Sequence, residues 1–329
     1  VIVLINSFNA MELGFLDDPN HYAYHPEIKA AVLVGAPSAG ADAIGEIVTG
    51  DVNPSGHTVD TFVRDLKKDP TWQNYSMNLQ EGGNEYVYDS NNTSSGLHYV
   101  HYEEGIYIGY RYYETRGYEE GFDTPYTAEG DKAVNGTTTT EWDSWYDANV
   151  VYPLGYGLSY TTFEWEPVSA QPDDGSVLAE DGEITVQVKV TNTGERPGKD
   201  VVQLYYTAPY NPKGADTAIE KAYVVLSGFQ KTKLLEPQES ETVTITMKVG
   251  DMKSYDYSDA NGNQFAGYEI VPGDYQIRLM KNSHTDGVMA ENSSSSFILS
   301  SPGITFPQDP DTGAAVGNLF TGETAYAGT

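Results

Sequence analysis

The stretch Tyr152–Tyr160, which reads YPLGYGLSY, separates two regions of the chain whose sequence patterns differ. It carries no charge and contains three tyrosines, two glycines and one proline. Glycine permits backbone conformations that a Cβ atom forbids, and tyrosine supplies apolar area with a polar tip. We therefore expect an aromatic connecting segment, with an α/β region before it and an all-β region after it.

The region before this stretch alternates apolar runs with helical segments. Val1–Asn6 is an apolar run rich in β-branched residues, which is typical of a strand buried on both faces of a parallel sheet. Lys29–Gly35 repeats the pattern and leads through a short loop to a helix expected over Ala41–Val48. Repeated strand–loop–helix units predict an α/β fold. Residues 1–165 are therefore predicted to be part of an open α/β sandwich domain.

In open α/β sheets, ligands bind at the loops that follow the carboxyl ends of the strands. Here those loops are Asn6–Ala10 and Ala36–Gly40, and both consist mainly of small or polar residues. The candidate substrate-facing residues are Ser7, Phe8, Asn9, Pro37 and Ser38. The alternative is that both loops are ordinary tight connections.

The region after the aromatic stretch is predicted to be all-β. Between Glu183 and Thr191, Ile and Val alternate with polar residues, as in a half-buried strand. Further strands are expected at Val201–Tyr206, Lys221–Gln230, Glu241–Val249, Asp274–Met280 and Ser296–Leu299. Short strands joined by turns predict a fibronectin type III or immunoglobulin-like β-sandwich over residues 166–301. Residues 302–329, rich in Pro, Gly, Asp and Thr, are expected to form a linker or docking tail.

Two polar segments, Val63–Leu97 and Gly117–Ala148, are expected to be surface excursions of the first region. Between them, aromatic and aliphatic residues surround Gly105 and Gly109 and are expected to pack densely. The four tryptophans lie outside every expected sandwich strand, at Trp72, Trp142, Trp145 and Trp165. A row of exposed tryptophans on the sandwich is therefore not expected.

The composition excludes several classes of function. A net charge of −30 repels nucleic acid and anionic membrane surfaces, so neither is expected as a partner. The absence of cysteine excludes disulfides, thiol nucleophiles and cysteine-based zinc sites. No apolar run reaches the length of a membrane helix. We expect a soluble protein, either secreted or cytoplasmic, and a homo-oligomer remains open.

The residues alone name no catalytic group. His98 and His101 form an H-x-x-H pair in an expected loop without an organising helix, so no metal site and no cofactor are expected. Glu12 follows the first loop, but a glutamate at the start of a helix is also explained by the helix dipole. The pattern does not place any two acidic residues as a catalytic carboxylate pair.

Several motifs, in this order along the chain, resemble glycoside hydrolase family 3. In the first region they are VIVLINS (1–7) with MEL (11–13), GDVNPSG (50–56), YEEGIYIGYRYY (102–113) and YPLGYGLSY (152–160). In the sandwich they are VTNTG (190–194), GKDVVQLY (198–205) and LSGFQK (226–231). The resemblance covers nearly everything up to about residue 300. It implies the C-terminal α/β domain and fibronectin type III-like domain of a β-glucosidase-like hydrolase.

The resemblance also implies a retaining mechanism with two carboxylates. The family's nucleophile Asp lies in a (β/α)8 barrel, and its acid/base Glu usually precedes the strand that Val1 begins here, so neither is expected in this chain. The expected partners are a β-glucoside or oligosaccharide substrate and the remaining polypeptide with the barrel and the acid/base loop. This segment would shape the active-site wall and support the barrel. The family's usual Gly-Gln-Glu-Gly type loop is PSAG (37–40) here.

Two alternatives stay open. Family members also act on β-xylosides or N-acetylglucosaminides, and the residues that decide this are expected mostly in the barrel. A protein of another class, a non-catalytic carbohydrate-binding or scaffold protein, could be built from the same two domains.

Overall fold

The computed structural model describes residues 1–35, 42–74, 85–87, 98–100, 102, 104–123, 141–209, 219–291, 293–309 and 312–316. The chain divides into two compact units. The first unit comprises Val1–Val52, Gly56–Ala133 and Thr138–Gly157, and the second comprises Asn53–Ser55, Val134–Thr137 and Leu158–Thr329. The division between the units falls inside the aromatic stretch, after Gly157.

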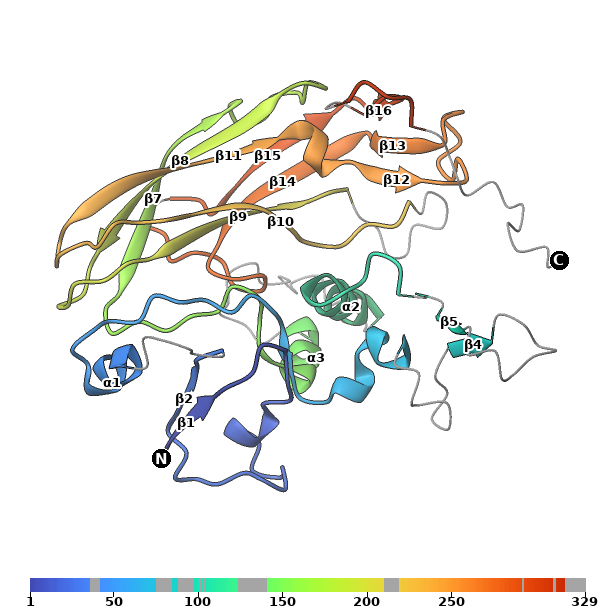
Figure 1. Cartoon of the computed structure of the whole chain (residues 1–329). Helices are drawn as coiled ribbons and strands as arrows, with labels where there is room; N and C mark the ends of the chain where they lie inside the picture. The colour runs from blue at the N-terminus through green and yellow to red at the C-terminus, as the bar shows by residue number, and fades with distance from the viewer. Residues whose placement is uncertain are drawn as a thin grey trace. The chain divides into compact units, whose positions relative to one another are not determined.

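The first unit begins with two parallel strands, β1 (Ile2–Ile5) and β2 (Ala30–Leu33) (Figure 1). They form a two-stranded sheet, and α1 (Asp42–Thr49) follows β2. The expectation that both strands are buried on both faces is wrong for the described residues. Ile2 is 43% exposed, Leu4 50% and Leu33 43%, so these side chains are not covered by the parts of the chain that the structure describes.

Short elements surround these strands. They are the 3-10 turns η1 (Gly14–Leu16), η2 (Leu66–Lys68) and η3 (Pro70–Asn74), and the strand pairs β3 (Phe62–Val63) with β6 (Val150–Tyr152) and β4 (Glu85–Val87) with β5 (His98–Val100). Ile5, Leu13 and Phe62 form the buried core of this part. The segment predicted as the first surface excursion therefore includes regular elements.

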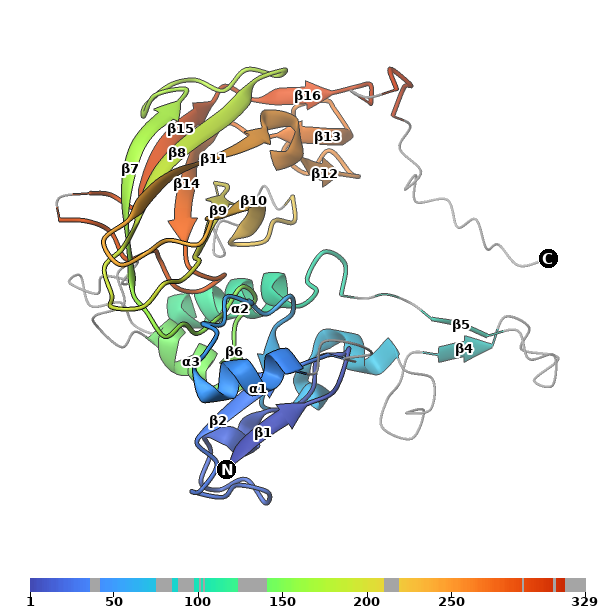
Figure 2. The same cartoon turned by 60° about the vertical axis from the view of Figure 1, so that its left-hand side comes forward.

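The prediction that Gly117–Ala148 is an irregular surface segment is wrong at both of its ends, where the structure has helices. Helix α2 (Tyr110–Asp123) extends past Gly117, and α3 (Glu141–Asn149) begins before Ala148. The two helices pack against each other (Figures 1 and 2). Their sequences are too polar to show a clear apolar stripe, so the pattern hid them, although single aromatic side chains such as Tyr113 and Tyr146 are buried.

The expected dense packing around Gly105 and Gly109 is also partly wrong. Tyr102 is 76% exposed and Ile108 is 54% exposed. Both glycines adopt a positive φ, of 56° and 57°, in the turn that leads into α2. A positive φ favours glycine, so these two positions serve the turn rather than a packed core.

The second unit is a β-sandwich with a small third sheet. Its strands are β7 (Phe163–Gln171), β8 (Glu183–Asn192), β9 (Val201–Thr207), β10 (Val225–Lys231), β11 (Ser240–Lys248), β12 (Ser254–Asp256), β13 (Gly267–Ile270), β14 (Gly273–Met280), β15 (Ser296–Ser301) and β16 (Ile304–Phe306), with the 3-10 turn η5 (Val249–Met252) after β11. The sheets have the orders β11-β8-β7, β10-β9-β14-β15 and β12-β13-β16, and every pairing is antiparallel. Figure 2 shows the three-stranded β11-β8-β7 sheet lying over β14 and β15.

The alternating residues of β8 fill the core between the sheets. Ile184, Val186, Val188 and Val190 are at most 1% exposed. Apolar residues of β9, β11, β14 and β15 belong to the same buried cluster as these residues of β8. The predicted sandwich is confirmed, and the described structure is mostly β.

Strand β7 corrects the expectation that every tryptophan lies outside the sandwich strands. Trp165 sits in β7 and is fully buried. The strand escaped prediction because Pro167 interrupts its alternation, and a register shift between Pro167 and Ser169 breaks the ladder. At the other end, β16 pairs with β13, so the stretch predicted as a tail begins with a strand.

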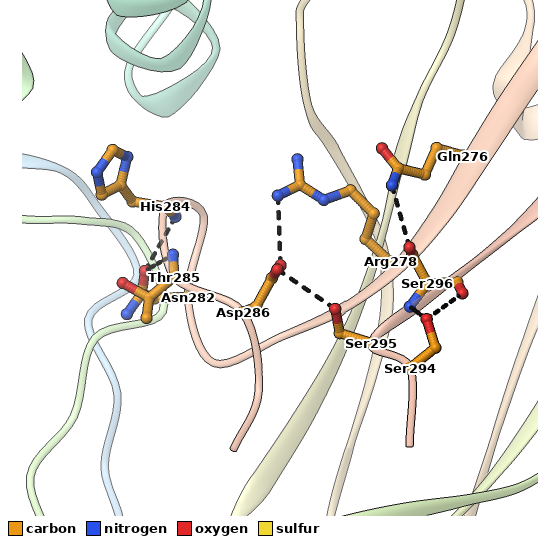
Figure 3. A network of polar contacts seen from close by, with 9 residues as sticks. All are labelled: Gln276, Arg278, Asn282, His284, Thr285, Asp286, Ser294, Ser295 and Ser296. Atoms are coloured by element: carbon orange, nitrogen blue, oxygen red, sulfur yellow. Dashed lines mark hydrogen bonds and ion pairs between the residues drawn. The ribbon is translucent and has the colours of Figure 1, made fainter. Parts of the chain in front are cut away.

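A polar network lies along β14, β15 and the turn between them (Figure 3). Arg278 Nη2 lies 3.3 Å from Asp286 Oδ1, and Ser295 donates to the other oxygen of Asp286. Asn282 Oδ1 accepts hydrogen bonds from the backbone N–H groups of His284 and Thr285, which closes the turn. The network therefore combines a buried ion pair with a side-chain-capped turn.

Candidate functional site

The parallel pairing of β1 and β2 decides where the candidate loops lie. Ile5 is opposite Leu33, and the N–H of Val34 donates to the carbonyl of Ile5 at 2.9 Å. The segments that follow both strands therefore leave the sheet at the same edge. This is the edge at which open α/β sheets bind ligands.

The first loop has a defined turn. Ser7 Oγ donates to the carbonyl of Asn9 at 3.0 Å and accepts from the N–H of Asn9 at 3.2 Å. These two bonds close the loop over Phe8, whose side chain is 83% exposed. Pro37 and Ser38 lie outside the described residues, so their expected substrate-facing role remains a prediction.

The segment after this loop is anchored on the chain around β3. Leu13 N–H donates to the Val63 carbonyl at 3.2 Å, and Glu12 Oε1 accepts from the Leu66 N–H at 2.9 Å. Glu12 precedes η1 and does not lie in a helix. Its carboxylate holds the start of η2, which is a structural role that neither sequence interpretation included.

A bidentate ion pair adds to this anchor. The guanidinium of Arg64 meets both oxygens of Asp17, at 2.6 and 2.8 Å, and its Nε donates to the Asp147 carbonyl. The hydrogen bonds that Arg64 donates to the carboxylate of Asp17 raise the pKa of Arg64 above its ordinary value. The segment that contains Ser7–Asn9 therefore begins at β1 and is held at its other end by the ion pair of Asp17 with Arg64.

A second polar cluster of this unit escaped the sequence analysis. The Tyr113 hydroxyl donates to Asp69 Oδ2 at 3.1 Å, and Asp69 Oδ1 accepts from the N–H and the hydroxyl of Thr71. Burial raises the pKa of Tyr113, so its phenol stays a neutral donor. Nearby in sequence, the buried Glu104 accepts from Asn74 Nδ2 at 2.8 Å.

This cluster is best explained as structural. Asp69 accepts three hydrogen bonds from Tyr113 and Thr71. Glu104 Oε1 accepts from Asn74, whereas Glu104 Oε2 is buried without a hydrogen-bond partner among the described residues. The sequence pattern predicts an aromatic packing segment at residues 102–113, and it gives no indication that the side chain of Glu104 is buried.

Neither a cluster of potential metal ligands nor a membrane-spanning helix is found in the described part of the chain. No group of three or more His, Cys, Asp and Glu side chains there is placed to hold a metal ion. His98 lies in β5 rather than in the expected loop, and His101 lies outside the described residues. None of the described helices is both long enough and apolar enough to cross a membrane.

Comparisons with known proteins agree with the motifs. The fibronectin type III-like domain family matches residues 200–283. β-Glucosidase A of Butyrivibrio fibrisolvens is 36% identical over 278 residues, which cover 82% of this chain and 27% of that protein. A β-glucosidase of Ruminococcus albus is 30% identical over 275 residues, covering 84% of this chain and 22% of that protein.

Solved structures show the same relationship. A β-glucosidase from Paenibacillus barengoltzii aligns with a TM-score of 0.61 and 29% identity, over 91% of this chain and 26% of its own. β-Glucosidase 3B from Thermotoga neapolitana, solved with α-D-glucose, aligns with a TM-score of 0.60 and 28% identity, over 93% of this chain and 32% of its own. The chain thus spans about a quarter of the length of the curated relatives it matches. Along most of its length the chain is thus similar to one part of these β-glucosidases, and it includes a match to the fibronectin type III-like domain, as the resemblance to glycoside hydrolase family 3 implies.

Proposed function

We propose that this chain is part of a retaining family 3 glycoside hydrolase that releases terminal β-linked glucose. The observation that carries this proposal is the 36% identity to β-glucosidase A of Butyrivibrio fibrisolvens along 82% of the chain. In this proposal the nucleophile Asp and the acid/base Glu come from sequence outside residues 1–329. The complete enzyme forms and then hydrolyses a glycosyl-enzyme intermediate.

Within this proposal, residues 1–165 are part of an α/β sandwich domain whose other elements cover β1 and β2. The exposed side chains of Ile2 and Leu4 on one face of this sheet and of Leu33 on the other support this, because exposed apolar surface is costly in water. Burying one such side chain contributes roughly 1.5–3 kcal/mol. The remaining polypeptide with the barrel is accordingly the expected partner.

The loop Ser7–Asn9 forms part of the substrate-facing wall in this proposal. Phe8 offers an exposed aromatic ring, and such a ring suits the apolar face of a sugar. The two hydrogen bonds between Ser7 and Asn9 fix the backbone that carries it. Pro37 and Ser38 remain proposed neighbours on the second loop.

The test compares this chain alone with the complete enzyme. We expect no hydrolysis of p-nitrophenyl β-glucoside by residues 1–329 alone, and hydrolysis once the barrel-carrying polypeptide is present. The β-xyloside and N-acetyl-β-glucosaminide substrates are assayed in parallel, and we expect lower kcat/KM values for both. Activity of the isolated chain would contradict the division of labour, and a faster reaction with β-xyloside would contradict the proposed substrate.

A carbohydrate-binding protein without catalysis is less well supported. Such a protein would use a row of exposed aromatic side chains on the sandwich, whereas among the described sandwich strands Phe229 on β10, 66% exposed, is the one strongly exposed aromatic residue. Trp165, the tryptophan of the described sandwich strands, is fully buried and donates from Nε1 to Asp200 Oδ2 at 2.7 Å. It contributes to the core and is not available to a sugar.

A further inference from the structure

The hairpin of β12 and β13 carries two acidic side chains on one face. Ser254 is opposite Glu269 and Asp256 is opposite Gly267 in its antiparallel register. Because side chains alternate along a strand, Asp256 and Glu269 lie diagonally across the same face. Each is only 2% exposed, which is unusual for a carboxylate.

Each of these carboxylates has one oxygen fixed by the loop between the strands. Asp256 Oδ1 accepts from the Ser258 N–H at 3.0 Å. Glu269 Oε2 accepts from the side-chain amides of Asn261 and Asn263, at 2.9 and 2.7 Å. The loop therefore sets the orientation of both groups, as outer hydrogen bonds orient the carboxylates of metal sites.

The other oxygen of each carboxylate is unpaired. Asp256 Oδ2 and Glu269 Oε1 are buried and have no hydrogen-bond partner in the described parts of the chain. A buried polar atom without a partner costs on the order of 1–3 kcal/mol, and more if it is charged. Two such atoms on one face of one hairpin indicate that something else binds them.

The positive charges nearby do not complete this pair. Lys221 is buried, and its positive charge acts to lower the pKa of Glu269. Among the described residues, however, Lys221 forms no ion pair within 4 Å with either carboxylate. Lys253 precedes the hairpin, and its ammonium lies 5.3 Å from the ring centroid of Tyr268. Two carboxylates and one lysine leave one negative charge in excess.

We propose that Asp256 Oδ2 and Glu269 Oε1 are ligands of a calcium ion. Calcium takes only oxygen ligands and accepts irregular arrangements, including backbone carbonyls such as those of the loop between the strands. Magnesium requires a near-ideal octahedron and gives up its water reluctantly, so it fits a buried pair less well. The site lies within the sandwich and does not depend on the proposed hydrolase activity.

Protonation of Glu269 is the alternative explanation, because it would remove the repulsion between the two buried carboxylates without a bound ion. Burial raises the pKa of Glu269, and the charge of Asp256 acts in the same direction. The two explanations differ in one respect that can be measured. Calcium bound to this pair stabilises the folded chain, and removal of either carboxylate abolishes that effect, whereas a protonated Glu269 gives no response to calcium.

The first test measures the melting temperature of the EDTA-treated 329-residue chain in CaCl2 and in NaCl of equal ionic strength. At a hundredfold excess over Kd, binding predicts a rise of roughly 5–10 °C in CaCl2 beyond that in NaCl. Mass spectrometry of bound metal should find one calcium ion per chain after dialysis. Equal melting temperatures in the two salts, or no retained calcium, would overturn the proposal.

Matched variants localise the effect. Glu269→Gln and Asp256→Asn should abolish the calcium-specific rise, whereas Glu164→Gln, at an exposed position on β7, should retain it. The same rise in all four proteins would mean general screening of the −30 net charge and would overturn the site. A larger rise with MgCl2 than with CaCl2 would overturn the choice of calcium. If a variant does not fold, the calcium response and retained calcium of the unmodified chain still decide.

Discussion

Arg278 and Asp286 form a buried ion pair, with 2% and 8% of their side chains exposed. Nη2 of Arg278 lies 3.3 Å from Oδ1 of Asp286, and no other hydrogen-bond partner of the guanidinium is present among the described residues (Figure 3). The ring of Tyr223 lies 5.9 Å from the guanidinium carbon. The buried charge of Arg278 therefore depends on one carboxylate.

Removing that carboxylate should be costly. We expect Asp286→Ala to lower the free energy of unfolding by about 3–5 kcal/mol, because it leaves a buried, unpaired guanidinium. Asp286→Asn should cost less than about 1.5 kcal/mol, since its amide oxygen can still accept from Arg278. Urea unfolding at pH 7 measures both values.

An exposed ion pair serves as the control. Lys189 and Glu166 are 3.0 Å apart, with 45% and 53% of their side chains exposed. Glu166→Ala should therefore cost no more than about 1 kcal/mol. Equal losses for Asp286→Ala and Glu166→Ala would show that burial of the first pair does not matter.

The buried pair of Arg278 and Asp286 also predicts that the free energy of unfolding depends on pH. Burial raises the pKa of Asp286 above its ordinary value of 3.8, and this outweighs the charge and hydrogen bond of Arg278. A group with a raised folded-state pKa contributes stability that is complete below its unfolded pKa and is lost as the pH rises through the folded pKa. The free energy of unfolding of the unmodified chain should thus fall relative to Asp286→Asn as the pH rises from 3.8. A difference that stays constant or grows in favour of the unmodified chain would contradict the raised pKa.

Gly287 lies against the buried ring of Trp165. A Cβ atom built on Gly287 would overlap Cε3 of that ring, which is held in place by its hydrogen bond to Asp200. Gly287→Ala should therefore destabilise the sandwich by about 1–3 kcal/mol. Gly250→Ala is the control, because its added Cβ would lie 3.7 Å from Phe306 Cε1, an ordinary contact distance. Thermal unfolding that ranks the two variants equally would reject the steric argument.

The sequence predicts those parts of the fold whose residues alternate cleanly. Strand β8 has strict alternation and is found where it was expected, whereas β7 has Pro167 and a register shift that conceal the same period. Helices α2 and α3 were missed because polar helices lack a periodic apolar signal. Hydrophobic periodicity is therefore informative only where one face of an element is consistently buried.

The candidate sites show a similar limit. The pattern located the loop at Ser7–Asn9, but the hydrogen bonds that shape it depend on local geometry. The diagonal placement of Asp256 and Glu269 on one face depends on the register of β12 with β13, which the twelve residues between the two acids do not reveal. Contacts set by register or by tertiary packing cannot be derived from residue types alone.

Asn192 fixes the turn after β8 with all of its side-chain hydrogen-bonding capacity. Its Oδ1 accepts from Thr161 Oγ1 and Gly194 N–H, and its Nδ2 donates to the carbonyls of Arg196 and Leu235. Asn192→Asp has the same shape but cannot donate, so two carbonyls lose their partner and face a negative charge. We expect a loss of about 2–4 kcal/mol in the free energy of unfolding at pH 7. The control Asn9→Asp makes the same charge change at an exposed position and should cost less than about 0.5 kcal/mol.

Phe8 separates the proposed substrate role of the first loop from a role in stability. Its side chain is 83% exposed, so Phe8→Ala should change the melting temperature of this chain by less than about 2 °C. In the complete enzyme, loss of a ring that contacts the sugar should lower kcat/KM for p-nitrophenyl β-glucoside about tenfold, which corresponds to about 1.4 kcal/mol. Tyr22→Ala is the matched control, because Tyr22 is a 95% exposed aromatic residue outside the loop, and it should leave kcat/KM unchanged. Equal kinetics for both variants would remove Phe8 from the substrate wall, while a fall in both would indicate a general effect on the α/β region. Because neither side chain contributes to the core, a selective loss in Phe8→Ala can only report on what the loop at the sheet edge touches.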